Sequence, residues 1–70
     1  MENELILLNR IKEYRKEKHL TQSDLAERIG VTRKTIYSIE NYEYIPSAKL
    51  AYLICLALNE KFEDIFYMEG

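Results

Sequence analysis

The residues from Thr21 to Asn41, TQSDLAERIGVTRKTIYSIEN, decide how this chain of 70 residues folds. Apolar side chains recur at helical spacing in both halves of the stretch, so each half predicts a short helix with one apolar face to bury. The apolar positions are Leu25, Ala26 and Ile29 in the first half and Ile36 and Ile39 in the second. The opposite faces are polar, as expected for helices at the surface of a small domain.

Both helices carry capping signals at their ends. Thr21 and Thr32 stand where an N-cap hydroxyl accepts hydrogen bonds from exposed backbone N–H groups, and Asp24 completes an approximate capping box with Thr21. Between the helices, Gly30 can take the left-handed conformation that ends a helix and turns the chain. Two capped helices joined by so short a turn must cross at a large angle, which is the geometry of a helix-turn-helix.

This stretch and the residues that follow it resemble the lambda repressor and Cro type of helix-turn-helix, also called the Xre family. The resemblance covers residues 9 to 66 and rests on Leu20-Thr21-Gln22, Leu25-Ala26, Ile29-Gly30-Val31, Ile36, Ile39-Glu40-Asn41, Pro46, Leu58 and Glu63-Asp64-Ile65-Phe66. The chain departs from the family pattern at His19, where glycine or asparagine is usual. It departs again at Tyr42, where a glycine commonly follows the asparagine, and we expect Asn41 to make that turn itself.

The flanking segments predict further helices. Residues 9 to about 18 read as the first helix, with Asn9 as its N-cap, and His19 is expected to end it in a left-handed conformation. Ser47 is a fitting N-cap for a helix over residues 48 to 58. That helix is apolar over much of its circumference, so it should be the most buried of the set.

The two ends of the chain predict a small sheet. Residues 61 to 64 fit a single helical turn, and residues 65 to 68 are prone to form a strand, which needs a partner to be stable. The aliphatic run at residues 5 to 8 fits either a strand or an extra helical turn, and we interpret it as that partner. The expected fold is one mainly α domain over residues 1 to 70, with about five short helices and an antiparallel β pair formed by the N- and C-terminal segments.

Composition excludes several classes of protein. A chain this short buries only about 60% of its unfolded surface, so no substrate cavity is expected. The single Cys55 lies in an apolar helical run, so it forms no disulfide framework or metal cluster and fits a reducing cytoplasm. The apolar run at residues 5 to 8 is too short for a membrane span and has no export signature. We expect no cofactor, metal or small-molecule ligand.

The net charge of −2 would be unusual for a DNA-binding protein if it were spread evenly. Between Asn9 and Ser38, however, there are eight basic residues and only four acidic ones, and the rest of the chain is acidic. The basic residues are Arg10, Lys12, Arg15, Lys16, Lys18, Arg28, Arg33 and Lys34. Such a dipolar molecule can present a positive face to DNA, although basic residues of this kind also commonly mark a solvated helix face.

The resemblance assigns roles to individual residues. Gln22 matches a position that braces the DNA backbone and the recognition helix, and Asn41 matches a position that contacts the backbone. The positions that match the groove-facing side of the recognition helix, at about 33 to 41, are Thr32, Arg33, Lys34, Thr35, Tyr37 and Ser38. The physics agrees for Arg33, because arginine can donate two hydrogen bonds to guanine O6 and N7, while Lys34 suits either a base or a phosphate. The hydroxyls of Tyr42 and Tyr44 suit contacts with the DNA backbone, and their rings suit packing in the core or in a dimer interface equally well.

Two further sets of residues concern structure. Arg15 and Glu40 match an internal ion pair that links the first helix to the recognition helix in the family. Apolar side chains on the terminal strands predict a homodimer interface, and a two-fold dimer predicts a palindromic operator in double-stranded DNA. The interface residues expected are Leu5, Leu7, Phe66 and Met68.

Three classes of function compete at this point. The resemblance favours a sequence-specific dimeric transcriptional regulator, most similar to repressors. The same DNA-binding domain also serves in antitoxins and in phage-type switch proteins, and a protein-interaction module is a third possibility. An enzyme is not expected, because the sequence offers no nucleophile and base pair, no metal-ligand spacing and no phosphate-binding glycine loop.

Overall fold

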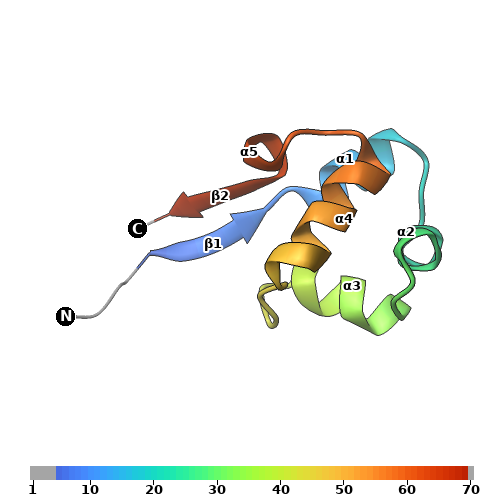
Figure 1. Ribbon diagram of the computed structural model, residues 1–70, viewed down its shortest axis with the longest axis horizontal. Helices are drawn as coiled ribbons and strands as arrows, with labels where there is room; N and C mark the ends of the chain where they lie inside the picture. The colour runs from blue at the N-terminus through green and yellow to red at the C-terminus, as the bar shows by residue number, and fades with distance from the viewer. Residues whose placement is uncertain (1–4, 70) are drawn as a thin grey trace.

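The computed structural model describes residues 5 to 69, which form five helices and one two-stranded antiparallel sheet. The elements in order are β1 (Ile6–Asn9), α1 (Ile11–Glu17), α2 (Gln22–Ile29), α3 (Arg33–Glu40), α4 (Ala48–Leu58), α5 (Phe62–Ile65) and β2 (Phe66–Glu69). Figure 1 shows α1 to α4 clustered at one end of the molecule, with the β1–β2 ribbon projecting away from them. The mainly α fold with a terminal β pair is therefore as predicted.

The sheet pairs the two ends of the chain, one residue further along than the sequence predicted. Leu7 lies opposite Met68, and Asn9 lies opposite Phe66. The first strand thus includes Asn9, whereas Ile65 belongs to α5 and not to the second strand. Ile65 stays in α5 because its backbone N–H donates to the carbonyl of Lys61 at 3.3 Å. Its own carbonyl accepts from the backbone N–H of Arg10 at 2.7 Å, which joins the end of α5 to the start of α1.

The assignment of Asn9 as the N-cap of the first helix was wrong by one position. Arg10 occupies the N-cap position and makes no side-chain capping bond, because the backbone of Asn9 remains in the sheet. The Asn9 side chain still supports the helix, since its Oδ1 accepts from the N–H of Ile11 at 3.2 Å. Its Nδ2 donates to the carbonyl of Ile39 at 2.9 Å, so Asn9 also ties the sheet to the end of α3.

The remaining capping predictions are confirmed. Thr21 and Asp24 form a reciprocal capping box at the start of α2, with both hydrogen bonds 2.9 Å long. Thr32 and Ser47 accept from backbone N–H groups at the starts of α3 and α4. Gly30 ends α2 in the left-handed conformation with φ of 81°, which is the bend that the helix-turn-helix requires.

The turn after α3 differs from the prediction. Tyr42, and not Asn41, takes the left-handed conformation, with φ of 62° against −97° for Asn41. The reason is local, because both the backbone N–H and the Nδ2 of Asn41 donate to the carbonyl of Tyr37, which keeps Asn41 in the last turn of the helix. His19, by contrast, has φ of 59° as predicted.

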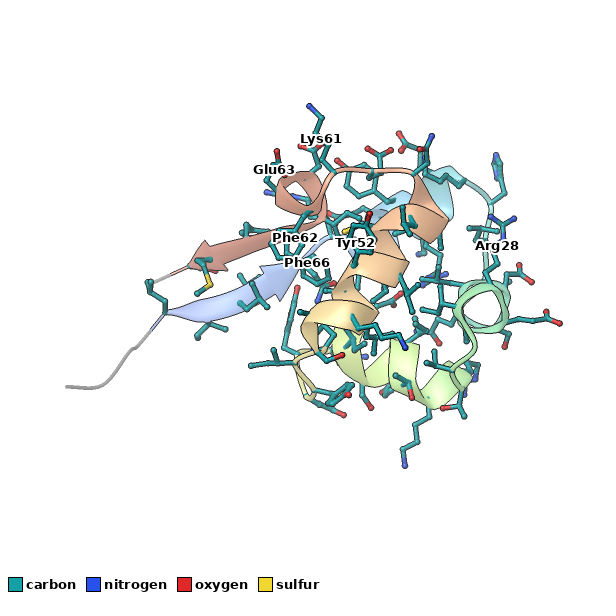
Figure 2. The ribbon with its side chains drawn as sticks, viewed as in Figure 1. Arg28, Tyr52, Lys61, Phe62, Glu63 and Phe66 are labelled. Atoms are coloured by element: carbon teal, nitrogen blue, oxygen red, sulfur yellow. The ribbon has the colours of Figure 1, made fainter. Side chains whose placement is uncertain are left out.

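The core lies where α4 crosses the helix-turn-helix and the inner end of the sheet. Its apolar members are Ile11, Leu25, Ala26, Ile36, Ile39, Leu50, Ala51, Ile54, Cys55, Leu58, Ile65 and Phe66. The inclusion of Phe66, which is 3% exposed, corrects its assignment to a dimer interface. Phe66 lies at the inner end of the ribbon, where its ring stacks on Phe62 with centroids 4.9 Å apart (Figure 2), so the subunit itself covers it.

Candidate nucleic-acid interface

The side of α3 that faces away from the core carries most of the residues predicted to contact DNA. Ile36 and Ile39 bury the inner side of the helix. Thr32, Arg33, Lys34, Tyr37 and Asn41 are exposed, whereas Thr35 and Ser38 are half-buried. The N-terminal turn of α3 is thus free to approach a groove of DNA, and it carries two adjacent cations, Arg33 and Lys34.

Arg33 is not a free side chain, because it is held from the start of α2. Its Nη1 donates to Oε1 of Gln22 at 2.9 Å. The other end of the Gln22 amide, Nε2, donates to Oε1 of Glu40 at 3.1 Å. Since Glu40 offers only acceptor oxygens when ionised, it sets which way the Gln22 amide points, and the Oε1 of Gln22 is left to face Arg33.

Glu40 is in turn held by Arg15 in a bidentate ion pair between α3 and α1. Nε and Nη2 of Arg15 donate to the two carboxylate oxygens of Glu40, at 2.8 and 3.2 Å. The side chains are only 8% and 4% exposed, and Nη1 of Arg15 donates to the carbonyl of Leu20 at 2.9 Å. A hydrogen-bonded chain therefore runs from the interior of the domain to Arg33 at the surface.

Other predicted contact residues are also engaged within the subunit. Thr32 Oγ1 accepts from the N–H of Thr35 at 3.2 Å, and the hydroxyls of these two residues lie 3.1 Å apart. The side chain of Asn41 is committed to the carbonyl of Tyr37. Tyr37 is 46% exposed, and no hydrogen bond or ring contact within the described residues involves its hydroxyl.

The loop after α3, whose tyrosines the sequence offered as contacts to the DNA backbone, lies beside α3. A shallow hollow of about 400 Å³ lies between α3 and the loop, with Glu43 and Tyr44 on its loop side. The backbone N–H of Glu43 donates to the carbonyl of Ser38 at 2.9 Å, which folds the loop back against the helix. Tyr42 and Tyr44 are about half exposed, so neither packs in the core of the subunit.

The positive face is weaker than the charge count suggested. Arg15 is buried in its ion pair, and Lys18 pairs with Glu60 at 3.1 Å. The Arg10 guanidinium lies 4.0 Å from the centre of the Tyr67 ring, where a cation–π contact holds it against the ribbon. On α1 and the helix-turn-helix, the exposed cations without an ion-pair partner among the described residues are Lys12, Lys16, Arg28, Arg33 and Lys34, and of these Arg33 and Lys34 lie on α3.

Two pKa shifts report on the surroundings of this motif. The hydrogen bonds from Thr21, first from its backbone and then from its side chain, lower the pKa of Asp24. Desolvation raises the pKa of the Tyr14 hydroxyl, and the nearby charge of Asp64 adds to the rise. Neither group belongs to α3, so these shifts concern how the motif is held and not the exposed side of α3.

The helix-turn-helix of this chain matches a known protein family. The family model described as helix-turn-helix, HTH_3, matches residues 11–65. The chain belongs to this family. Its α2 and α3 correspond to the two helices of the DNA-binding motif, of which the second is the recognition helix.

Individual relatives agree with the family. The chain is 50% identical over 60 residues to an uncharacterized HTH-type transcriptional regulator of Archaeoglobus fulgidus, covering 86% of this chain and 84% of the relative. It is 44% identical over 61 residues to the uncharacterized HTH-type transcriptional regulator YgzD of Bacillus subtilis, covering 87% and 92%. A crystal structure of a candidate DNA-binding protein from Bacteroides fragilis is similar with a TM-score of 0.80 and 29% identity, covering 89% of this chain and all of that one.

Within residues 5 to 69, no group of three or more His, Cys, Asp or Glu side chains is arranged to hold a metal ion. None of the helices described is long and apolar enough to cross a membrane.

Proposed function

We propose that the protein is a sequence-specific transcriptional repressor that reads the major groove with α3 and binds a palindromic operator as a homodimer. Membership of the helix-turn-helix family makes it a DNA-binding transcriptional regulator. The observation that supports base reading is the placement of Arg33, which is exposed at the N-terminal turn of α3 and held there by Gln22. A regulator of this kind works where the DNA lies, which we take to be the cytoplasm.

The hold of Gln22 on Arg33 supports a role in specificity as well as in affinity. An arginine has five N–H donors, and Gln22 uses only one of them, so enough remain for a bidentate contact with guanine. A side chain that a hydrogen bond already restrains loses less conformational entropy on binding than a free one. Lys34, whose side chain is exposed and makes no hydrogen bond or ion pair within the described residues, suits a phosphate.

The homodimer follows from the size of the reading surface. A single recognition helix covers one half-site, and a small interface of this kind rarely reaches useful specificity alone. Two copies related by a two-fold axis would place their recognition helices about 34–36 Å apart, which is one turn of DNA. The operator is then an inverted repeat whose half-sites have centres about 10 base pairs apart.

The decisive experiment compares Arg33→Ala with Lys34→Ala on DNA selected from a random pool by the wild-type protein. Arg33→Ala should weaken binding to the selected operator by about 1–3 kcal/mol per contact and relax the preference at one base pair in each half-site. Lys34→Ala is the matched control, because it removes an adjacent cation of equal charge. It should weaken selected and random DNA to a similar extent.

Equal loss of selected and random DNA binding in Arg33→Ala would show that Arg33 contacts phosphate and that base reading lies elsewhere on α3. Failure of the wild-type protein to retard any duplex at low salt would overturn the proposed function altogether. That result would favour a protein-interaction module.

A further inference from the structure

An exposed apolar surface lies on the opposite side of α4 from the core. Tyr52 and Leu56 on α4 are 64% and 59% exposed, and Phe62 at the start of α5 is 51% exposed. We call these three residues the α4–α5 face. Soluble proteins rarely leave several large apolar side chains together in contact with water. Such a surface therefore usually marks a contact with another molecule.

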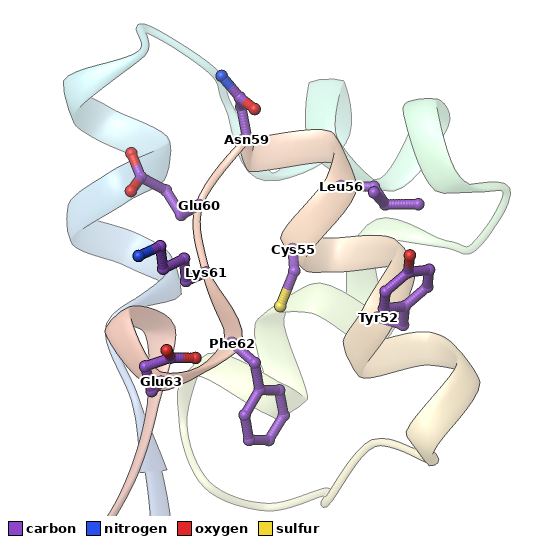
Figure 3. Close-up of a pocket in the computed structure, with 8 residues that line it drawn as sticks. All are labelled: Tyr52, Cys55, Leu56, Asn59, Glu60, Lys61, Phe62 and Glu63. Carbon is purple, nitrogen blue, oxygen red and sulfur yellow. The ribbon is translucent and has the colours of Figure 1, made fainter.

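The α4–α5 face is concave as well as apolar. A hollow of about 560 Å³ opens between α4 and the segment that leads into α5, and all three residues of the face line it. Figure 3 shows Phe62 on one side of this hollow and Tyr52 and Leu56 on the other, with Cys55 at its floor. A surface that carries both a hollow and protruding apolar side chains can be complementary to itself, as a two-fold interface requires.

Charged residues of both signs surround this face, and Glu60, Lys61 and Glu63 line the hollow itself. Lys49 lies three residues before Tyr52 and seven before Leu56, so helical spacing puts it on the same side of α4. Glu63 lines the hollow at the other end of the face. Among the described residues the ion pairs are Arg15–Glu40 and Lys18–Glu60, which leaves Lys49 and Glu63 without an ion-pair partner inside the subunit.

The terminal ribbon is a weaker candidate for the interface than the sequence suggested. Of the residues predicted there, Phe66 is buried and Leu7 packs partly against the core. Leu5 and Met68 are about half exposed, but they lie toward the outer end of a ribbon only two strands wide. The stacking of Phe66 on Phe62 shows where the inner end of the ribbon meets the α4–α5 face (Figure 2).

We infer that a second copy of this chain docks on the α4–α5 face, with the two α4 helices antiparallel across the two-fold axis. Leu56 and Phe62 of each subunit would then fill the hollow of the other, and Lys49 would meet the partner's Glu63. This inference rests on the homodimer of the proposed function and names the surface that forms it. It replaces the terminal strands as the dimer interface.

The test is the mass of the protein in sedimentation equilibrium, for the wild type, Leu56→Glu and Met68→Glu. The two variants are matched, since each puts a glutamate at an apolar position that is between 50 and 60% exposed in the subunit. Both should fold, with an unchanged helical signal in circular dichroism. Leu56→Glu should raise the dimer dissociation constant at least about a hundredfold, because the substitution removes one leucine from each subunit and so two from the two-fold interface. Met68→Glu should leave the dissociation constant nearly unchanged.

A charge exchange tests the orientation separately. Lys49→Glu alone should weaken the dimer by placing two glutamates together, and Glu63→Lys added to the same chain should restore it, because the opposite charges meet again across the axis. Restoration would not occur if the two residues merely supported the fold of their own subunit.

Three results would overturn the inference. They are a Leu56→Glu variant that remains a dimer, a Met68→Glu variant that becomes the monomer instead, and a wild-type chain that is monomeric at tens of micromolar. None of them decides whether α3 reads DNA, because the selection of DNA by the wild-type protein is measured independently. The first two results move the interface and leave the homodimer of the proposed function standing, whereas the third would remove that homodimer, so failure of the interface and failure of the proposed function are distinguishable.

Discussion

Removing the carboxylate of Glu40 should destabilise the fold more than the loss of any surface charge. Arg15 is 8% exposed, and two of its three guanidinium nitrogens donate to Glu40. In Glu40→Ala, the guanidinium keeps only the carbonyl of Leu20 as a partner, and Nε2 of Gln22 also loses its acceptor. The charge of Arg15 would thus stay buried without compensation.

The expected loss in the free energy of unfolding is about 3–5 kcal/mol, the usual range when one partner of a buried pair is removed. A domain of this length has a total stability of roughly 4–10 kcal/mol. Glu40→Ala should therefore consume a large part of that stability, and a fraction of the protein could be unfolded without denaturant.

Urea unfolding of Glu40→Ala, Arg15→Ala and the double variant measures this loss and the coupling between the two residues. Glu60→Ala is the control, because its pair with Lys18 has side chains that are 23% and 31% exposed and should contribute less than about 1 kcal/mol. The double variant should lose much less than the sum of the single variants, since removing both partners leaves no unpaired charge. Small and additive losses at both positions would refute the buried ion pair as a source of stability.

Two further changes test local features of the motif. Tyr42→Gly should raise stability by up to about 1 kcal/mol in urea unfolding, because glycine takes the positive φ of 62° without strain; Tyr44→Gly should give no gain. Asp24→Asn tests the capping box through the pH dependence of stability. The pKa of Asp24 is lower in the folded protein than in the unfolded chain, where it is near 4. The Asp24 carboxylate therefore stabilises the fold fully above the unfolded pKa, and this stabilisation fades as the pH falls through the folded pKa. The stability difference between wild type and Asp24→Asn should therefore shrink below about pH 4, and a difference independent of pH would contradict this.

The helix-turn-helix could be predicted from the sequence because its determinants are local. The hydroxyls of Thr21, Thr32 and Ser47 cap helices that begin immediately after them, and Gly30 turns the chain where it stands. Each of these interactions joins residues at most four positions apart. The turn at Tyr42 was missed for a local reason too, since the side chain of Asn41 bonds back to Tyr37 and keeps its own backbone helical.

The parts that could not be predicted depend on how distant segments pack. Helix α4 is apolar around much of its circumference, so its sequence alone does not indicate that Ile54 is buried and Leu56 exposed. Phe66 was expected at a surface, and it is covered because the ribbon starts against the core and beside Phe62.

The chain of hydrogen bonds behind Arg33 was likewise foreseen only in part. The pairing of Arg15 with Glu40 was expected from the family resemblance, and the structure brings the two side chains together. The bond from Gln22 to Glu40 joins residues 18 positions apart, and it forms only because α2 and α3 meet at the angle set by Gly30. Periodicity and capping signals contain no information about such a contact.

The central claim is that a dimer of this protein reads a specific DNA sequence with α3. The most direct test is the ratio of the protein's affinities for two DNA duplexes. One is the best sequence recovered from a random pool, and the other has the same composition in scrambled order, both at physiological salt. We predict that the recovered sequence is an inverted repeat with half-site centres about 10 base pairs apart, bound at least about a thousandfold more tightly than the scrambled duplex. A ratio near one, or a recovered site without two-fold symmetry, would contradict the claim.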